Sequence, residues 1–282
     1  MPPSASATIP NTSSSTPMSF TSTSSARPLH AAGQRRWFVV AGPKPAARVR
    51  LIAFPHAGGG PSVYAGWSRA LEGEPIEVVA AHLPGRDERA AEPPPADLDA
   101  LVDALADAAA PLVDRPCAFF GHSMGAILAF EVARRLRARG LDAPALLLAS
   151  GSPAPQLPRV DLGLRFVDGD PTFLEAVASA YGGVPRIVLE CGGLREEMVA
   201  ALRADIALME TYRCIDAPPL VCAIAAYGGD RDPIVAGDRL AAWREQTTGP
   251  FSVRRFEGDH FYLTRARDGL LADIRSRLQP LT

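Results

Sequence analysis

The chain has 282 residues, of which 47% are apolar and 21% are charged, and its 29 basic and 31 acidic side chains give a formal net charge of −2. This composition is that of a globular protein with a sizeable core, and the even mixture of charges excludes the basic field expected of a protein that binds nucleic acid or an anionic membrane. Because no apolar run reaches the roughly 18 to 20 residues that cross a bilayer, and the N-terminus lacks the apolar stretch of a secretory signal, we expect a cytoplasmic protein.

The first segment, residues 1–36, is expected to be a disordered leader. Residues 1–26 include fourteen Ser or Thr and no charged side chain. A segment with so few large apolar groups cannot bury enough surface to offset the entropy of ordering its backbone. The folded domain is therefore expected to span residues 37–282.

Six apolar segments of strand length follow the leader. Most are apolar at successive positions, which is typical of parallel strands covered by helices on both faces. Apolar residues repeat every three or four positions from Leu98 to Leu112, and again from Met124 to Arg139, where Gly140 is a good C-terminal cap. This alternation predicts an α/β protein with a mostly parallel, doubly wound sheet. The predicted strands are 49–54, 76–81, 117–120, 145–149, 220–227 and 251–256.

One connection between strands is much longer than the others. Residues 150–219 contain two helical patterns, at 173–181 and 194–212. Long insertions in compact domains are usually functional and often form lids over active sites. We therefore expect a helical lid insertion at about 155–215, and the alternative is a second small domain without an active role.

The strongest local signal is Gly121-His122-Ser123-Met124-Gly125, which matches the G-x-S-x-G pattern of a nucleophile elbow. A predicted strand precedes it and a predicted helix follows it, which is the context that the pattern requires. The turn is so tight that a Cβ at either glycine would collide with neighbouring backbone. Ser123 is thereby expected at the carboxyl edge of the sheet, as a nucleophile at a helix N-terminus. The alternative is a strand-to-helix turn with a capping serine.

A serine hydroxyl needs a histidine base and a carboxylate that orients the base. Of the five histidines, only His260 follows the last predicted strand, as the chain order serine, acid, histidine of α/β-hydrolases requires. The acid is expected in the loop after the strand at 220–227, where Asp230 and Asp232 are both candidates. Spacing alone leaves both open, and we favour Asp232, which precedes a proline.

Anionic intermediates of acyl transfer need two backbone donors. One is expected to be the amide of Met124, directly after the nucleophile, and the other an amide in the loop after the strand at 49–54. In that loop Ala57 is followed by three glycines, which allow the backbone to approach the serine closely, and the amide of Ala57 is the predicted second donor. The glycines are not a phosphate-binding P-loop, because no G-K-[ST] follows them.

Five motifs in this order resemble the type II thioesterases that accompany polyketide synthases and nonribosomal peptide synthetases. The resemblance runs from about residue 37 to the C-terminus. It implies an α/β-hydrolase with a flexible helical lid that needs no cofactor or metal. It also implies Ser123, Asp232 and His260 as nucleophile, acid and base, and the amides of Ala57 and Met124 as the oxyanion hole. The motifs are Phe54-Pro55-His56-Ala57-Gly58-Gly59, Leu83-Pro84-Gly85-Arg86, Gly121-His122-Ser123-Met124-Gly125-Ala126, Ala241-Ala242-Trp243-Arg244 and Gly258-Asp259-His260-Phe261-Tyr262-Leu263.

By this resemblance the chain clears stalled or misprimed acyl groups from the phosphopantetheine arm of acyl or peptidyl carrier proteins. The partners are then carrier protein domains, with no nucleic acid and no membrane, and a monomer is expected. Two other classes remain as alternatives: a carboxylesterase or acyltransferase on the same scaffold, and a non-catalytic binding module.

Overall fold

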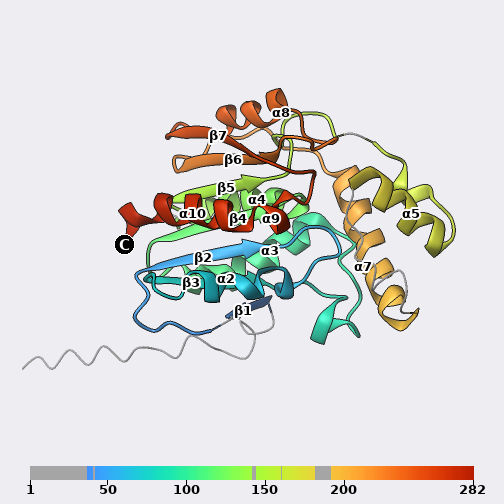
Figure 1. The fold of residues 1–282 in the computed structure, drawn as a ribbon, viewed down its shortest axis with the longest axis horizontal. Coiled ribbons are helices and arrows are strands. Elements are labelled where there is room, and N and C mark those ends of the chain that lie inside the picture. Colours follow the sequence, from blue (N-terminus) through green and yellow to red (C-terminus); the bar gives the residue numbers. More distant parts are fainter. Residues whose placement is uncertain (1–36, 41, 142–143, 160, 182–191) are drawn as a thin grey trace, which may run out of the picture.

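The structure is a computed structural model that describes residues 37–40, 42–141, 144–159, 161–181 and 192–282. The leader predicted at 1–36 lies outside these residues. Within them, the chain forms a sheet with helices on both faces and a helical insertion at one end of the sheet (Figure 1).

The sheet has seven strands in the order β1-β3-β2-β4-β5-β6-β7. Every neighbouring pair is parallel except β1 and β3, which are antiparallel. The predicted α/β fold with a mostly parallel, doubly wound sheet is therefore confirmed. The strands are β1 (Phe38–Val40), β2 (Val49–Phe54), β3 (Ile76–Ala81), β4 (Cys117–His122), β5 (Leu146–Ser150), β6 (Ala223–Gly229) and β7 (Phe251–Phe256).

Four strands differ from the sequence prediction. β4 ends two residues later than predicted, and β5 is shifted by one residue. The edge strand β1 was not predicted, because a single run of three residues carries no periodic signal. The strand predicted at 220–227 begins only at Ala223: Leu220 makes an isolated bridge to Thr247, and Val221 is 74% exposed.

Helices cover both faces of the sheet, and β2 to β5 are therefore buried at every position. One apolar cluster joins the sheet to α3, α4 and α8, and a second joins its other face to α2, α9 and α10. Figure 1 shows these layers on either side of the strands. The bounds are α2 (Ala65–Ala70), α3 (Leu98–Ala109), α4 (Met124–Ala138), α8 (Gly237–Ala241), α9 (Tyr262–Arg265) and α10 (Arg267–Leu278).

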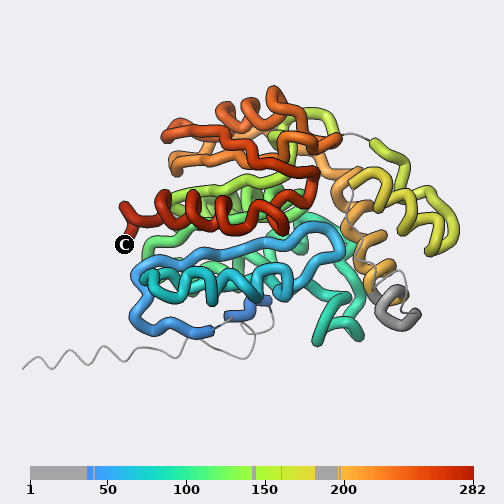
Figure 2. The backbone as a smooth tube through the Cα atoms, viewed as in Figure 1, coloured from blue at the N-terminus to red at the C-terminus, as the bar shows by residue number. Residues whose placement is uncertain are grey.

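The insertion between β5 and β6 contains α5 (Asp170–Tyr181) and α7 (Gly192–Thr211), close to the two predicted helices. These helices pack on each other through a third apolar cluster. They lie beyond the carboxyl ends of the strands, at the opposite end of the molecule from the C-terminus (Figure 2). Just after α7, the hydroxyl of Tyr212 donates to Glu131 Oε1 of α4 at 2.7 Å. In the described ranges no helix has the length and apolar character needed to cross a bilayer.

Candidate active site

Ser123 lies at the sharp turn between β4 and α4. Its backbone has φ 56° and ψ −116°, a conformation that few non-glycine residues adopt. A Cβ on Gly121 would overlap the carbonyl oxygen of Gly125, and a Cβ on Gly125 would overlap that of Phe54. The amide of Ser123 donates to the Ser150 carbonyl at 2.8 Å, which ties the turn to β5. The predicted need for both glycines is therefore confirmed by the packing of the backbone.

Ser123, His260 and Asp232 form a continuous hydrogen-bonded line. His260 Nε2 lies 3.1 Å from Ser123 Oγ, and His260 Nδ1 lies 2.9 Å from Asp232 Oδ2. The other carboxylate oxygen of Asp232 accepts from the amides of Ile234 and Val235 at 2.8 and 3.2 Å. In the tautomer whose Nδ1–H donates to the buried carboxylate of Asp232, Nε2 of His260 is free to accept from the serine hydroxyl.

Asp230, the other candidate acid, has a different hydrogen-bond partner. Its carboxylate accepts from the amide of Gly258 at 2.8 Å, and its side chain is 46% exposed. That hydrogen bond holds the pKa of Asp230 below its ordinary value. The structure thus brings Asp232, and not Asp230, into contact with the histidine.

The loop after β2 forms a tight turn around Ala57. The amide of Gly59 donates to the His56 carbonyl at 2.9 Å, and Gly58 has φ 72°, as in a type II turn. Because a trans peptide directs its carbonyl and its N–H to opposite sides, the amide of Ala57 points out of this turn. In the part of the chain that the structure describes, neither this amide nor that of Met124 donates a hydrogen bond. Both are available to an external oxygen atom.

Two histidines next to the site, the partly buried His56 and the fully buried His122, were given no role by the sequence prediction. Nδ1 of His56 lies 2.9 Å from the Ala57 carbonyl oxygen. Nδ1 of His122 lies 2.8 Å from Ser150 Oγ, and its ring centre lies 5.1 Å from that of His260. Burial lowers the pKa of His56, and it lowers the pKa of His122 well below its ordinary value. Both side chains are therefore neutral near pH 7.

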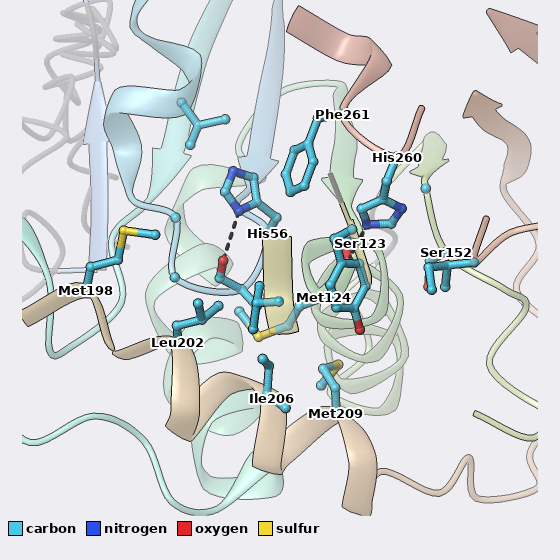
Figure 3. Close-up of a pocket in the computed structure, with 18 of the residues that line it drawn as sticks. His56, Ser123, Met124, Ser152, Met198, Leu202, Ile206, Met209, His260 and Phe261 are labelled. Carbon is cyan, nitrogen blue, oxygen red and sulfur yellow. Dashed lines mark hydrogen bonds between the residues drawn. The ribbon is translucent and has the colours of Figure 1, made fainter. Parts of the chain in front are cut away.

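A cavity of about 300 Å³ adjoins Ser123 and His260. Four apolar side chains of α7 line one wall of the cavity (Figure 3). From the end of α5, the ring of Tyr181 approaches that of His260 to 5.1 Å between centres. The cavity can therefore hold an apolar group next to the serine. The four side chains of α7 are those of Met198, Leu202, Ile206 and Met209.

The sequence prediction also missed a buried ion pair beside this cavity. Asp205 of α7 and Arg86 are both almost fully buried, and their side chains form two hydrogen bonds of 2.7 and 3.0 Å. A carboxylate within the apolar stripe of a predicted helix was the signal that could have pointed to Asp205. Among the described residues, no group of three His, Cys, Asp or Glu side chains is arranged to hold a metal ion.

Known proteins are similar to this chain in both sequence and fold. A family model described as the thioesterase domain matches residues 49–278. The gramicidin S biosynthesis protein GrsT of Aneurinibacillus migulanus is 39% identical over 232 residues, which are 82% of this chain and 90% of GrsT.

Two solved structures give the same result. The type II thioesterase BorB from the borrelidin biosynthetic cluster has a TM-score of 0.77 and 37% identity over 86% of this chain and 97% of BorB. The RedJ thioesterase from the prodiginine pathway of Streptomyces coelicolor has a TM-score of 0.75 and 39% identity over 82% of this chain and 86% of RedJ. The chain therefore belongs to the thioesterase family, the family that its sequence motifs predicted.

Proposed function

We propose that the protein hydrolyses acyl thioesters on the phosphopantetheine arm of acyl or peptidyl carrier proteins. It would thereby clear stalled or misprimed groups during polyketide or nonribosomal peptide biosynthesis. The observation that carries the proposal is the hydrogen-bonded line from Asp232 through His260 to Ser123 beside an apolar cavity. The names of GrsT, BorB and RedJ, which refer to gramicidin S, borrelidin and prodiginine biosynthesis, support the substrate class.

In the acylation step, Ser123 is the nucleophile and His260 the general base. The hydroxyl proton of Ser123 passes to His260 Nε2 while Oγ bonds to the thioester carbonyl carbon. The resulting oxyanion accepts from the amides of Ala57 and Met124. When the intermediate collapses, the carbon–sulfur bond breaks, and the pantetheine sulfur takes the proton from the imidazolium. Asp232 stabilises that imidazolium without itself becoming protonated.

The deacylation step uses the same groups in the same order. A water molecule gives a proton to His260 and attacks the acyl-serine carbonyl, and the oxyanion again rests on the two amides. Collapse releases the carboxylic acid, and His260 returns the proton to Ser123. Acylation and deacylation pass through similar tetrahedral intermediates, so the amides of Ala57 and Met124 can stabilise the oxyanion in both steps.

The helical insertion is proposed to act as a lid that recognises the acyl chain. The apolar side chains of α7 and the end of α5 enclose the space beside the serine, which suits an aliphatic or aromatic acyl group. All the proposed catalytic groups come from one chain, so a monomer is sufficient for the reaction. No cofactor or metal takes part in any of these steps.

The test is hydrolysis of acyl-phosphopantetheinyl carrier proteins that differ in acyl length, followed by intact-protein mass spectrometry. We expect loss of the acyl mass at a rate that depends on chain length. Preferential turnover of small p-nitrophenyl esters would instead indicate a carboxylesterase. Product formation only when an acceptor thiol or amine is present would indicate an acyltransferase.

A further inference from the structure

A buried carboxylate of the lid helix holds the turn that carries a proposed oxyanion donor. Asp205 lies on α7, and its Oδ2 accepts from the amide of Gly58 at 2.8 Å. Arg86 binds both oxygens of Asp205 and also donates to the Gly59 carbonyl at 3.1 Å. The Gly58 amide and the Gly59 carbonyl, which are held in this way, belong to the two residues that follow Ala57.

The peptide between Ala57 and Gly58 is fixed at both ends. Its carbonyl oxygen lies 2.9 Å from His56 Nδ1, and its N–H points at Asp205. These two contacts hold the central peptide of the turn in the type II orientation. The anchored turn also holds the peptide that carries the Ala57 N–H, because the Gly59 amide donates to the carbonyl oxygen of that peptide, which belongs to His56, at 2.9 Å. Without an acceptor at Asp205, the Gly58 amide would be left unpaired beneath α7, which disfavours the type II orientation.

The helix also packs directly on the turn. A Cβ built on Gly58 would lie only 3.2 Å from Leu202 Cδ1 and 3.4 Å from Leu202 Cβ. Leu202, Ile206 and Met209 lie on either side of Asp205 along the helix and line the cavity. The wall that would touch an acyl chain and the group that holds the turn are therefore parts of one rigid element.

Stability alone does not require this ion pair. A buried pair such as Asp205 with Arg86 loses much of its Coulomb energy to desolvation, and apolar side chains of similar volume often replace such pairs at no cost. What an apolar replacement cannot supply is an acceptor for the Gly58 amide.

We propose that Asp205 is a positioning residue for thioester hydrolysis: by accepting from Gly58, it sets the turn that aims the Ala57 amide at the oxyanion. The position of α7, which lines the acyl cavity, thereby also determines how the Ala57 amide of the oxyanion hole is oriented. This inference rests on the proposed function, because it assumes that Ser123 attacks an acyl carbonyl.

Two double variants separate this role from a structural one. Arg86→Met with Asp205→Leu removes both charges and the acceptor, whereas Arg86→Met with Asp205→Asn removes the charges and keeps an acceptor for Gly58. Glu77→Gln is the matched control, since Glu77 forms a buried pair with Arg50 at the far end of the sheet. The melting temperature of each variant is measured first. Its kcat and KM are then measured with acetyl and decanoyl thioesters of N-acetylcysteamine and with p-nitrophenyl acetate.

The leucine variant is expected to lose roughly 10²-fold in kcat with every substrate, near the lower end for loss of one oxyanion donor, while KM stays within about twofold. The asparagine variant should keep at least about ten times more of kcat than the leucine variant, and Glu77→Gln should lose stability but not kcat. A loss confined to KM or to the decanoyl substrate, or equal kcat in the two double variants, would overturn the inference alone. A wild-type protein inert toward ester and thioester alike would overturn the proposed function and this inference with it.

Discussion

Replacing Asp232 by asparagine should disable the base while leaving the fold intact. In the structure, one carboxylate oxygen accepts from His260 and the other from the amides of Ile234 and Val235. An asparagine keeps the two amide contacts only if its carbonyl oxygen faces them. Its NH₂ group then faces His260 and forces Nδ1 to accept. The imidazole proton moves to Nε2, 3.1 Å from Ser123 Oγ, so the ring cannot take the serine proton.

The size of the effect follows from this change of tautomer. A triad whose histidine is held in the wrong tautomer loses about 10⁴ in kcat, which corresponds to about 5 kcal/mol of transition-state stabilisation. The volume and the two amide contacts of Asp232 are retained, so we expect the thermal midpoint to change far less than the activity.

The assay is kcat for an acyl thioester of N-acetylcysteamine, followed through the released thiol. Asp230→Asn is the matched control, because Asp230 lies on the same loop, has a side chain that is 46% exposed, and accepts from the backbone amide of Gly258 beside the exposed Arg231. It should keep kcat within about threefold, as a surface side chain away from the reacting atoms. An Asp232→Asn enzyme within tenfold of wild type, or an equal loss in Asp230→Asn, would refute the proposed role of Asp232.

Two further predictions concern stability. Gly125→Ala should lower the free energy of unfolding by roughly 4 kcal/mol or more, because the new Cβ overlaps the Phe54 carbonyl oxygen. Gly140 has φ 75° but no neighbour within 4 Å of the position that a Cβ would take, so Gly140→Ala should lower the free energy of unfolding by only about 1–2 kcal/mol. Urea unfolding midpoints measure both changes, and equal losses in the two variants would contradict the prediction. Since burial depresses the pKa of His56 and His122 in the folded state, the unfolded chain binds more protons below about pH 6.5, and stability should fall by up to about 1.4 kcal/mol per pH unit for each histidine as the pH drops toward 5. His122→Asn should flatten that slope in urea titrations, and an unchanged slope would argue against the buried neutral state.

The sheet was predictable because its central strands are apolar on both faces and its helices carry regular apolar stripes. β2, β3 and β7 have the predicted bounds. The sequence predicts less well where a strand begins and ends. Leu220 and Val221 continue the apolar run of β6, yet strand pairing begins at Ala223, since only the neighbouring strands decide where a ladder starts.

The site was predictable where chemistry fixes chain order. Ser123 was identified by its turn and His260 by its place after the last strand. Spacing could not decide between two aspartates on one loop, because the direction of each side chain depends on the local backbone. Asp205 and Arg86 are 119 positions apart in sequence. Only the tertiary packing of α7 on the turn brings them together.

In the proposed reaction, Ser123 accepts the acyl group of a carrier-bound thioester. The most direct test incubates an acetylated carrier protein with wild-type protein or with Ser123→Ala and follows the acetyl mass on the carrier. We expect the wild type to remove the acetyl group and the variant to leave it in place, because loss of the nucleophile costs roughly 10⁶ in kcat. Clearance by Ser123→Ala at a rate comparable to wild type would contradict the account.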